Sequence, residues 1–78
     1  MAKNVKVYST ATCPWCIRAK QFLKENNINF QDIDLSGNQQ AVDEMMQKSG
    51  QMGVPVLDIE GEIIVGFDKE RIKSALGL

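Results

Sequence analysis

The chain has 78 residues, so we expect residues 1–78 to fold as one small domain. Nine Lys and Arg residues oppose ten Asp and Glu residues, and the formal charge of −1 argues against non-specific nucleic-acid binding, which needs a basic patch. The chain has no histidine, which excludes imidazole chemistry and His-ligated metals, and no apolar run approaches the roughly 18 residues that span a bilayer.

The first half of the chain predicts a strand, a helix and a strand in turn. Residues 3–9 alternate apolar and polar side chains, which is the two-residue period of a strand. A helix is predicted from Pro14 to about Asn26, because proline loses no hydrogen bond at the first helical position and apolar residues recur every three or four positions. Residues 28–35 predict a second strand. The expected core-facing side chains are Val5 and Val7, then Cys16, Ala19, Phe22 and Leu23, then Ile28, Phe30, Ile33 and Leu35.

A second helix is predicted after the break at residues 36–38, and it runs to about Ser49. Gly50 is a suitable stop, because glycine readily adopts the left-handed backbone that ends many helices. The buried side of this helix is expected to carry Val42, Met45 and Met46.

The last part of the chain predicts a hairpin and a final helix. Residues 54–59 and 62–65 read as two strands, and a tight turn at Glu60-Gly61 joins them. Asp68 is then placed to cap the final helix, since aspartate is a favoured N-cap residue. The side chains of this helix that are expected to face the sheet are Ile72, Ala75 and Leu76.

These segments follow the order β-α-β-α-β-β-α, and the expected fold class is α/β. Each β-α-β passage predicts a right-handed crossover and a parallel strand pair, whereas the hairpin predicts an antiparallel pair. The predicted architecture is therefore a mixed four-stranded sheet flanked by three helices, with helices on both faces.

The residues that carry chemistry are concentrated at Cys13-Pro14-Trp15-Cys16, between the first strand and the first helix. Cysteines at this spacing lie within one helical turn and are close enough to form a disulfide. Cys13 is predicted to be the N-cap, where the free N–H groups of Trp15 and Cys16 and the helix dipole favour a thiolate over a thiol. Cys16 lies one turn further on the apolar face, where we expect it to be buried and less acidic. The motif therefore predicts one attacking and one resolving cysteine.

Other uses of the cysteine pair carry less weight. A structural disulfide would close a loop too short to stabilise the fold, since that effect grows with loop length. A zinc site normally needs four ligands, and this chain offers no third cysteine and no histidine. Zinc or a four-thiolate iron–sulfur cluster would thus require two chains. A non-enzymatic interaction module would leave the pair unused, which its position between a strand and a helix start argues against.

Three landmarks stand out along the chain. They are Cys13-Pro14-Trp15-Cys16 after Tyr8-Ser9, Val54-Pro55 after the second helix, and Gly66-Phe67-Asp68 after the hairpin. Together they resemble the pattern of the glutaredoxins, which belong to the thioredoxin-fold superfamily, over about residues 5–76. The resemblance implies a minimal thioredoxin fold and a cycle in which a dithiol is oxidised to a disulfide and reduced again.

The resemblance also implies a binding site for glutathione. In glutaredoxins the proline of the second landmark is cis and lies beside the active-site cysteines, and Pro55 matches it. The residue before it, here Val54, pairs its backbone with the cysteinyl part of glutathione. Gly66, Phe67 and Asp68 match the region that holds the γ-glutamyl end, and Trp15, beside the cysteines, completes the set of expected glutathione-binding residues. Asp68 at a helix start suits a group that carries both a carboxylate and an ammonium, and its role as a cap is compatible with that.

Four positions depart from the usual glutaredoxin pattern. Many members carry Lys where this chain has Thr10, Tyr where it has Trp15, Thr where it has Gly53, and Gly where it has Val65. The absent lysine removes a cation near the thiolate, for which Lys48 and Arg18 are candidate substitutes. These changes resemble small redoxins of the NrdH type, which a flavoprotein reductase reduces. Trp15 would serve there as an apolar platform for a protein partner, or as a shield for the disulfide.

We therefore expect a thiol–disulfide oxidoreductase that reduces protein or glutathione mixed disulfides through Cys13 and Cys16 and is regenerated by glutathione. The alternatives are an NrdH-like redoxin reduced by a thioredoxin-reductase-type flavoprotein and, with less support, a cysteine-ligated metal or iron–sulfur dimer. No metal or tightly bound cofactor is expected, and glutathione is the expected co-substrate. The expected partners are glutathione, disulfide-containing proteins and, in the alternative, the flavoprotein. We expect a monomer without nucleic-acid or membrane partners, in the cytoplasm because the sequence starts without a signal-peptide core.

Overall fold

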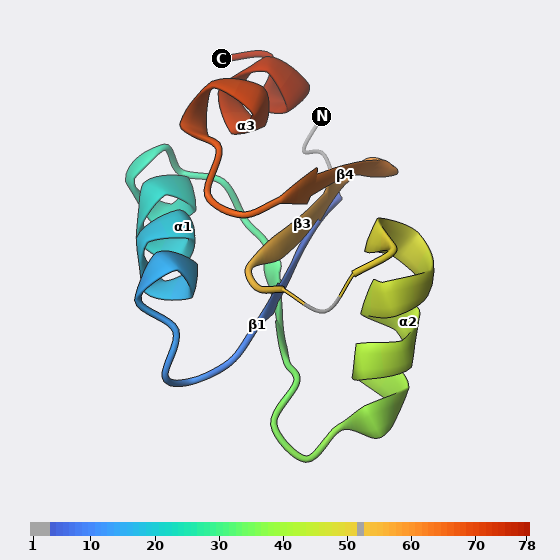
Figure 1. Ribbon diagram of the computed structural model, residues 1–78. Coiled ribbons are helices and arrows are strands. Elements are labelled where there is room, and N and C mark those ends of the chain that lie inside the picture. The colour runs from blue at the N-terminus through green and yellow to red at the C-terminus, as the bar shows by residue number, and fades with distance from the viewer. Residues whose placement is uncertain (1–3, 52) are drawn as a thin grey trace.

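The computed structural model describes residues 4–51 and 53–78. Its elements are β1 (Val5–Ser9), α1 (Pro14–Glu25), β2 (Gln31–Asp34), α2 (Gln39–Ser49), β3 (Val56–Ile59), β4 (Glu62–Val65) and α3 (Lys69–Leu76). The four strands form one sheet in the order β2-β1-β3-β4, with α1 and α3 over one face and α2 over the other (Figure 1). The expected element order and the mixed four-stranded sheet are therefore confirmed. Lys3, which the sequence placed in the first strand, lies outside the described residues.

One predicted strand pairing is wrong. β1 and β2 are parallel, but β1 pairs antiparallel with β3, and β3 pairs antiparallel with β4. Because Val56 lies opposite Tyr8, β3 begins at the end of the sheet where β2 stops, and the second β-α-β passage makes no parallel pair. An extended chain covers more than twice the distance per residue that a helix does. The short extended link after α2 can therefore span the length of the helix and bring the chain back to the end of the sheet where β2 stops.

The start of β2 also differs from the prediction, because the residues before it belong to the end of α1. The N–H of Ile28 bonds to the carbonyl of Leu23 at 2.9 Å, and the N–H of Asn27 bonds to that of Lys24 at 3.0 Å. Asn27 has a positive φ of 58°, so the three features form a Schellman-type helix termination. This arrangement ties the chain to α1, and the strand starts only at Gln31.

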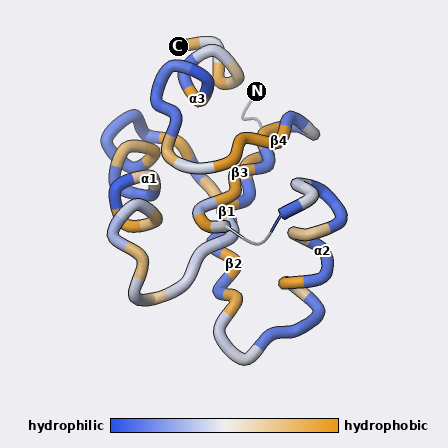
Figure 2. Tube along the Cα trace, in the orientation of Figure 1, coloured by the Kyte–Doolittle hydropathy of each residue, from blue (hydrophilic) through white to orange (hydrophobic). Residues whose placement is uncertain are grey.

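The sheet separates two apolar clusters. Figure 2 shows hydrophobic residues along β3 and β4 and mostly hydrophilic ones along α2. The cluster on the α1–α3 face contains the buried residues Val5, Val7, Ala19, Phe22, Leu23, Leu57, Ile59, Ile64, Ile72 and Ala75. The cluster on the α2 face contains the buried residues Tyr8, Leu35, Ala41, Met45 and Val56.

One residue of α2 that was predicted to be buried is exposed. Met46 is 41% exposed, whereas Ala41 and Met45 are buried. Residues four apart share a helix face, so Ala41 and Met45 point to the sheet together, and Met46 is rotated about 100° from Met45. The face of α2 that packs on the sheet therefore carries fewer apolar side chains than the sequence predicted.

The predicted turn and helix ends are confirmed. Glu60 and Gly61 join β3 to β4 with φ values of 52° and 91°, which is the pattern of the tight type I′ hairpin turn. Gly50 ends α2 in the left-handed region, and Asp68 is the N-cap of α3. Within the part of the chain that the structure describes, no helix is long and apolar enough to cross a membrane.

Candidate active site

The amino-terminal end of α1 carries the two cysteines. Cys13 is the N-cap, and its Sγ accepts a hydrogen bond from the N–H of Cys16 at 3.2 Å. Pro14 follows at the first position of the helix, as expected. Both cysteines are free thiols, with Cys13 half-buried and Cys16 fully buried. Cys13 thus occupies the predicted capping position, and the difference in exposure between the two thiols is the expected one.

The surroundings of Cys16 disfavour its thiolate. Burial and a hydrogen bond with Cys13 raise the pKa of the Cys16 thiol from 9.0 to about 11. A hydrogen bond from the backbone of Thr10 and the positive charge of Lys20 act in the opposite direction. Cys13, in contrast, reaches the surface and receives a helix N–H on its sulfur. This difference suits a mechanism in which Cys13 attacks first and Cys16 follows.

The segment before β3 lies beside the Cys13 thiol. The Val54–Pro55 peptide bond is cis, as the resemblance implied, and the Val54 carbonyl oxygen is 4.0 Å from Cys13 Sγ. Pro55 is buried, and Val54 packs against the cluster on the α2 face. The Pro55 carbonyl accepts the N–H of Gly66 at 2.7 Å, which continues the contact of β3 with β4 by one step. Regular strand pairing begins only at Val56, two residues later than predicted.

Residues 66–68 connect β4 to α3 next to this segment. Gly66 has a φ of 80°, which favours glycine, and nothing lies within 4 Å of the place where a Cβ would stand. The ring of Phe67 packs edge-on against Phe22 of α1, with centroids 6.0 Å apart. The Asp68 carboxylate accepts the N–H of Arg71 at 3.3 Å and is exposed to solvent. Gly66 and Asp68 therefore present an open surface at the start of α3, and Phe67 anchors the connection to α1.

These contacts join five of the predicted site residues: Cys13 with Cys16 and Val54, and Pro55 with Gly66. Trp15 stands apart from them, since 56% of its surface is exposed and the Arg18 guanidinium lies over its ring at 4.9 Å. Arg18 is thus held next to the cysteine motif. Lys48 instead lies on the α2 face, where its ammonium is 2.7 Å from Asp58.

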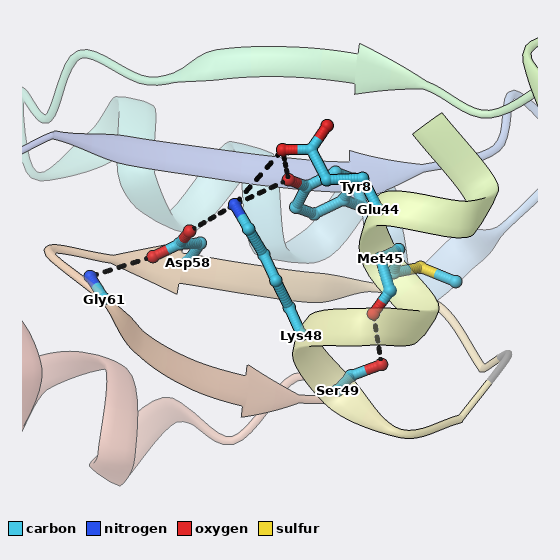
Figure 3. Close-up of polar contacts among 7 residues, drawn as sticks. All are labelled: Tyr8, Glu44, Met45, Lys48, Ser49, Asp58 and Gly61. Atoms are coloured by element: carbon cyan, nitrogen blue, oxygen red, sulfur yellow. Dashed lines mark hydrogen bonds and ion pairs between the residues drawn. The ribbon is translucent and has the colours of Figure 1, made fainter. Parts of the chain in front are cut away.

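The sequence analysis missed a polar cluster on the α2 face, which Figure 3 shows and which we call the Lys48 cluster (Tyr8, Glu44, Lys48 and Asp58). The Lys48 ammonium contacts Asp58 Oδ2 at 2.7 Å, the Tyr8 hydroxyl at 3.0 Å and Glu44 Oε1 at 3.3 Å. The Tyr8 hydroxyl donates to Glu44 at 3.0 Å. The four-residue spacing of Glu44 and Lys48 signals a helical ion pair. No local sequence pattern predicts that Tyr8 and Asp58 belong to this cluster, because they come together only through the pairing of β1 with β3.

Among the described residues, no group of three or more His, Cys, Asp and Glu side chains is arranged to hold a metal ion. The two cysteines would therefore need ligands from outside the described residues to bind zinc or a cluster.

Comparison with known proteins relates the whole arrangement to one family. The sequence profile of the glutaredoxins matches residues 5–64. An uncharacterized glutaredoxin-like 8.6 kDa protein in the rubredoxin operon of Clostridium pasteurianum is 48% identical over 72 residues, covering 92% of this chain and 96% of its own. Glutaredoxin 3 of Escherichia coli is 38% identical over 65 residues, covering 83% and 78%. The crystal structure of a glutaredoxin from Archaeoglobus fulgidus matches with a TM-score of 0.87 at 26% identity, covering 94% and 85%.

Proposed function

This chain belongs to the glutaredoxin family, and from that premise we propose that it is a thiol–disulfide oxidoreductase in which Cys13 and Cys16 alternate between dithiol and disulfide. The observation that carries the proposal is the free, half-buried thiol of Cys13 at the N-cap of α1, one turn before the buried thiol of Cys16. A helix N-terminus stabilises negative charge, and the thiolate is the form of cysteine that attacks disulfides.

The proposed reaction has two steps. The Cys13 thiolate attacks one sulfur of the substrate disulfide, the other sulfur leaves as a thiolate, and a mixed disulfide forms on Cys13. Cys16 then loses its proton and attacks Cys13 Sγ, which releases the second substrate thiolate and leaves a Cys13–Cys16 disulfide. Two electrons pass from the protein to the substrate, and two molecules of glutathione restore the dithiol while they are oxidised to a disulfide.

We propose glutathione as the co-substrate because the residues around Cys13 fit its parts. A cysteinyl group bonded to Cys13 would lie along the backbone of Val54, whose carbonyl is 4.0 Å from the sulfur. The open surface at Gly66 leads to the start of α3. There the helix N–H groups suit the γ-glutamyl carboxylate, and the Asp68 carboxylate suits its ammonium. Phe67 supports this connection from below, and the exposed ring of Trp15 would flank the bound tripeptide.

Turnover with glutathione and glutathione reductase as the electron source tests the proposal. Cys13→Ser should abolish turnover on every disulfide, whereas Cys16→Ser should still reduce glutathione mixed disulfides, since that route needs only the attacking thiol. Asp68→Asn keeps a side chain that caps helices but removes the charge, so glutathione-dependent turnover should fall about tenfold or more, while reduction by dithiothreitol stays nearly unchanged. Activity that survives Cys13→Ser would sink the mechanism. Equal loss with both reductants would reduce Asp68 to a cap.

An NrdH-like redoxin, reduced by a thioredoxin-reductase-type flavoprotein, is the second candidate. Trp15 and Ile17 expose 56% and 55% of their surfaces beside the dithiol, which offers apolar area to a protein partner. Lys48 is also engaged on the opposite face of the sheet and supplies no charge for glutathione at the dithiol. Turnover sustained by NADPH and thioredoxin reductase, but not by glutathione, would favour this candidate. In either role we propose a cytoplasmic monomer, and bound metal in anaerobically purified protein would instead indicate a cysteine-ligated dimer.

A further inference from the structure

A polar cluster joins α1 to the edge strand β2, one helical turn after the buried cysteine. The Lys20 ammonium lies 3.0 Å from Asp32 Oδ2 and 3.2 Å from Oδ1, so it contacts both oxygens of the carboxylate. The hydroxyl of Ser9 donates to Asp32 Oδ1 at 3.0 Å. Ser9 is 1% exposed, and the side chain of Lys20 is 20% exposed. The ammonium is therefore paired with a carboxylate that is 48% exposed and that also bonds to the end of β1.

The position of this ammonium relates it to Cys16. Lys20 follows Cys16 by four residues on α1, and residues at that spacing share a helix face. Side chains on a helix lean toward its amino-terminal end, which carries Lys20 back over the turn of Cys16. Cys13 and Lys20 are the titratable groups that act on Cys16, while Asp32 and Asp34 of β2 face Lys20. Lys20 is thus a cation one helical turn from the buried thiol, and its charge lowers the pKa of that thiol.

We propose that Lys20, held by Asp32 and Ser9, is a positioning residue for the second step of the reaction, where its charge favours the thiolate of Cys16. The inference rests on the proposed function and assigns a part of it to residues outside the three landmarks. Burial is the largest cause of the raised pKa of Cys16 and persists when Cys13 is in the mixed disulfide, whereas the charge of Lys20 acts in the opposite direction.

Lys20 neither gives nor takes a proton in this step. The Cys16 thiol releases its proton to water, and the resulting thiolate attacks Cys13 Sγ. The sulfur–sulfur bond of the mixed disulfide breaks, and the substrate sulfur leaves with the electron pair and takes up a proton from water. The Cys13–Cys16 bond that forms leaves the protein oxidised by two electrons and the substrate reduced by two.

Ellman's reagent separates the two steps on the reduced protein. Attack by Cys13 releases a first coloured thiolate at a rate proportional to the reagent concentration, and resolution by Cys16 releases a second at a rate independent of it. Lys20→Met keeps the apolar stem and removes the charge. A tenfold drop in the fraction of Cys16 that is thiolate would by itself slow the second phase about tenfold. Because a more basic sulfur is also a better nucleophile, we expect the second phase to slow only about threefold. The first phase should not change.

Two further variants make the test specific to charge. Lys20→Arg should restore the second phase, and Lys24→Met, which removes an exposed lysine one turn further along α1, should leave both phases unchanged. The rate of the second phase should rise with pH to the same degree in Lys20→Met and in the unaltered protein. At each pH the rate should be lower in the variant. An unchanged second phase in Lys20→Met, equal slowing of both phases, or equal slowing in Lys20→Arg would overturn the inference. A missing first phase in the unaltered protein would overturn the proposed function instead, and a missing second phase would overturn its resolving step.

Discussion

The two faces of the sheet hold their helices by different kinds of interaction. α1 and α3 pack on one face through side chains such as Leu23 and Ile72, which are fully buried and apolar. α2 packs on the other face through a smaller apolar cluster around Met45 and through the Lys48 cluster (Figure 3). The dithiol belongs to the first face, and Val54 belongs to the second. The site therefore joins an apolar half to a half that is partly held by charges, and solvent conditions should act on the second half first.

The largest effect should come from a cavity on the apolar face. Leu23→Ala removes a fully buried side chain between α1 and the sheet, and such changes cost about 2–5 kcal/mol. The free energy of unfolding from urea titration measures it, and α3 should loosen together with α1. Ile17→Ala, at a position that is 55% exposed on the same helix, is the control and should cost far less. A loss below about 1 kcal/mol for Leu23→Ala would contradict the importance given to this face.

A smaller loss is expected from the charged face. Lys48→Met keeps the stem of the side chain but leaves the Asp58 carboxylate, 14% exposed, without its cation. Breaking a fully buried pair costs about 3–5 kcal/mol, but Lys48 is 28% exposed, so water screens part of the loss and we expect about 1–2 kcal/mol. Lys24→Met, on the exposed side of α1, serves as the control. If both lysine variants lose the same stability, the Lys48 cluster adds nothing to the attachment of α2.

The smallest effect is the pH dependence of the charged face. Burial raises the pKa of Asp58, but hydrogen bonds from Lys48 and the N–H of Gly61 outweigh it and hold that pKa below its usual value. Hydrogen bonds from Tyr8 and Lys48 lower the pKa of Glu44. A carboxyl group whose pKa is lowered by folding contributes stability above its unfolded pKa, and this contribution is lost as the pH falls through the folded value. Stability should thus decline below about pH 4.

The same variant tests that dependence. The decline in acid should be smaller in Lys48→Met, because its carboxylates lack the partner that lowers their pKa values. Hydrogen bonds that Lys48 donates to Asp58 and Tyr8 raise the pKa of Lys48, so its contribution persists up to the ordinary lysine value of 10.5 and disappears as the pH rises beyond it. Unfolding free energies from pH 2 to 8 measure the acid limb. Identical slopes in the two proteins would show that other carboxyl groups cause the acid loss.

The parts of the molecule that sequence reasoning reached are those that local chemistry determines. Caps at Cys13 and Asp68, and the turn at Glu60-Gly61, depend on a few neighbouring residues and follow from their side chains and backbone preferences. The cis bond before Pro55 came from resemblance and not from local chemistry.

The features that sequence reasoning did not reach depend on distant segments. The antiparallel course of β3 depends on where the link after α2 ends. The Lys48 cluster needs Tyr8 and Asp58, which are 50 positions apart in the sequence and meet Lys48 only through the pairing of β1 and β3. The ion pair of Lys20 with Asp32 likewise bridges α1 and β2. Contacts of this kind cannot be predicted from neighbouring residues, because the strand register decides which side chains meet.

The position of Trp15 places the chain's tryptophan fluorescence at the active site. It is the chain's one tryptophan, it stands between the two cysteines in the sequence, and more than half of the residue's surface is exposed to solvent. Its emission therefore originates at the dithiol and from nowhere else in the chain. Oxidation or reduction of the pair should therefore change this emission, and a fluorescence titration with dithiothreitol measures that change without a label. Trp15 is thus an intrinsic fluorescent probe of the redox state of the dithiol.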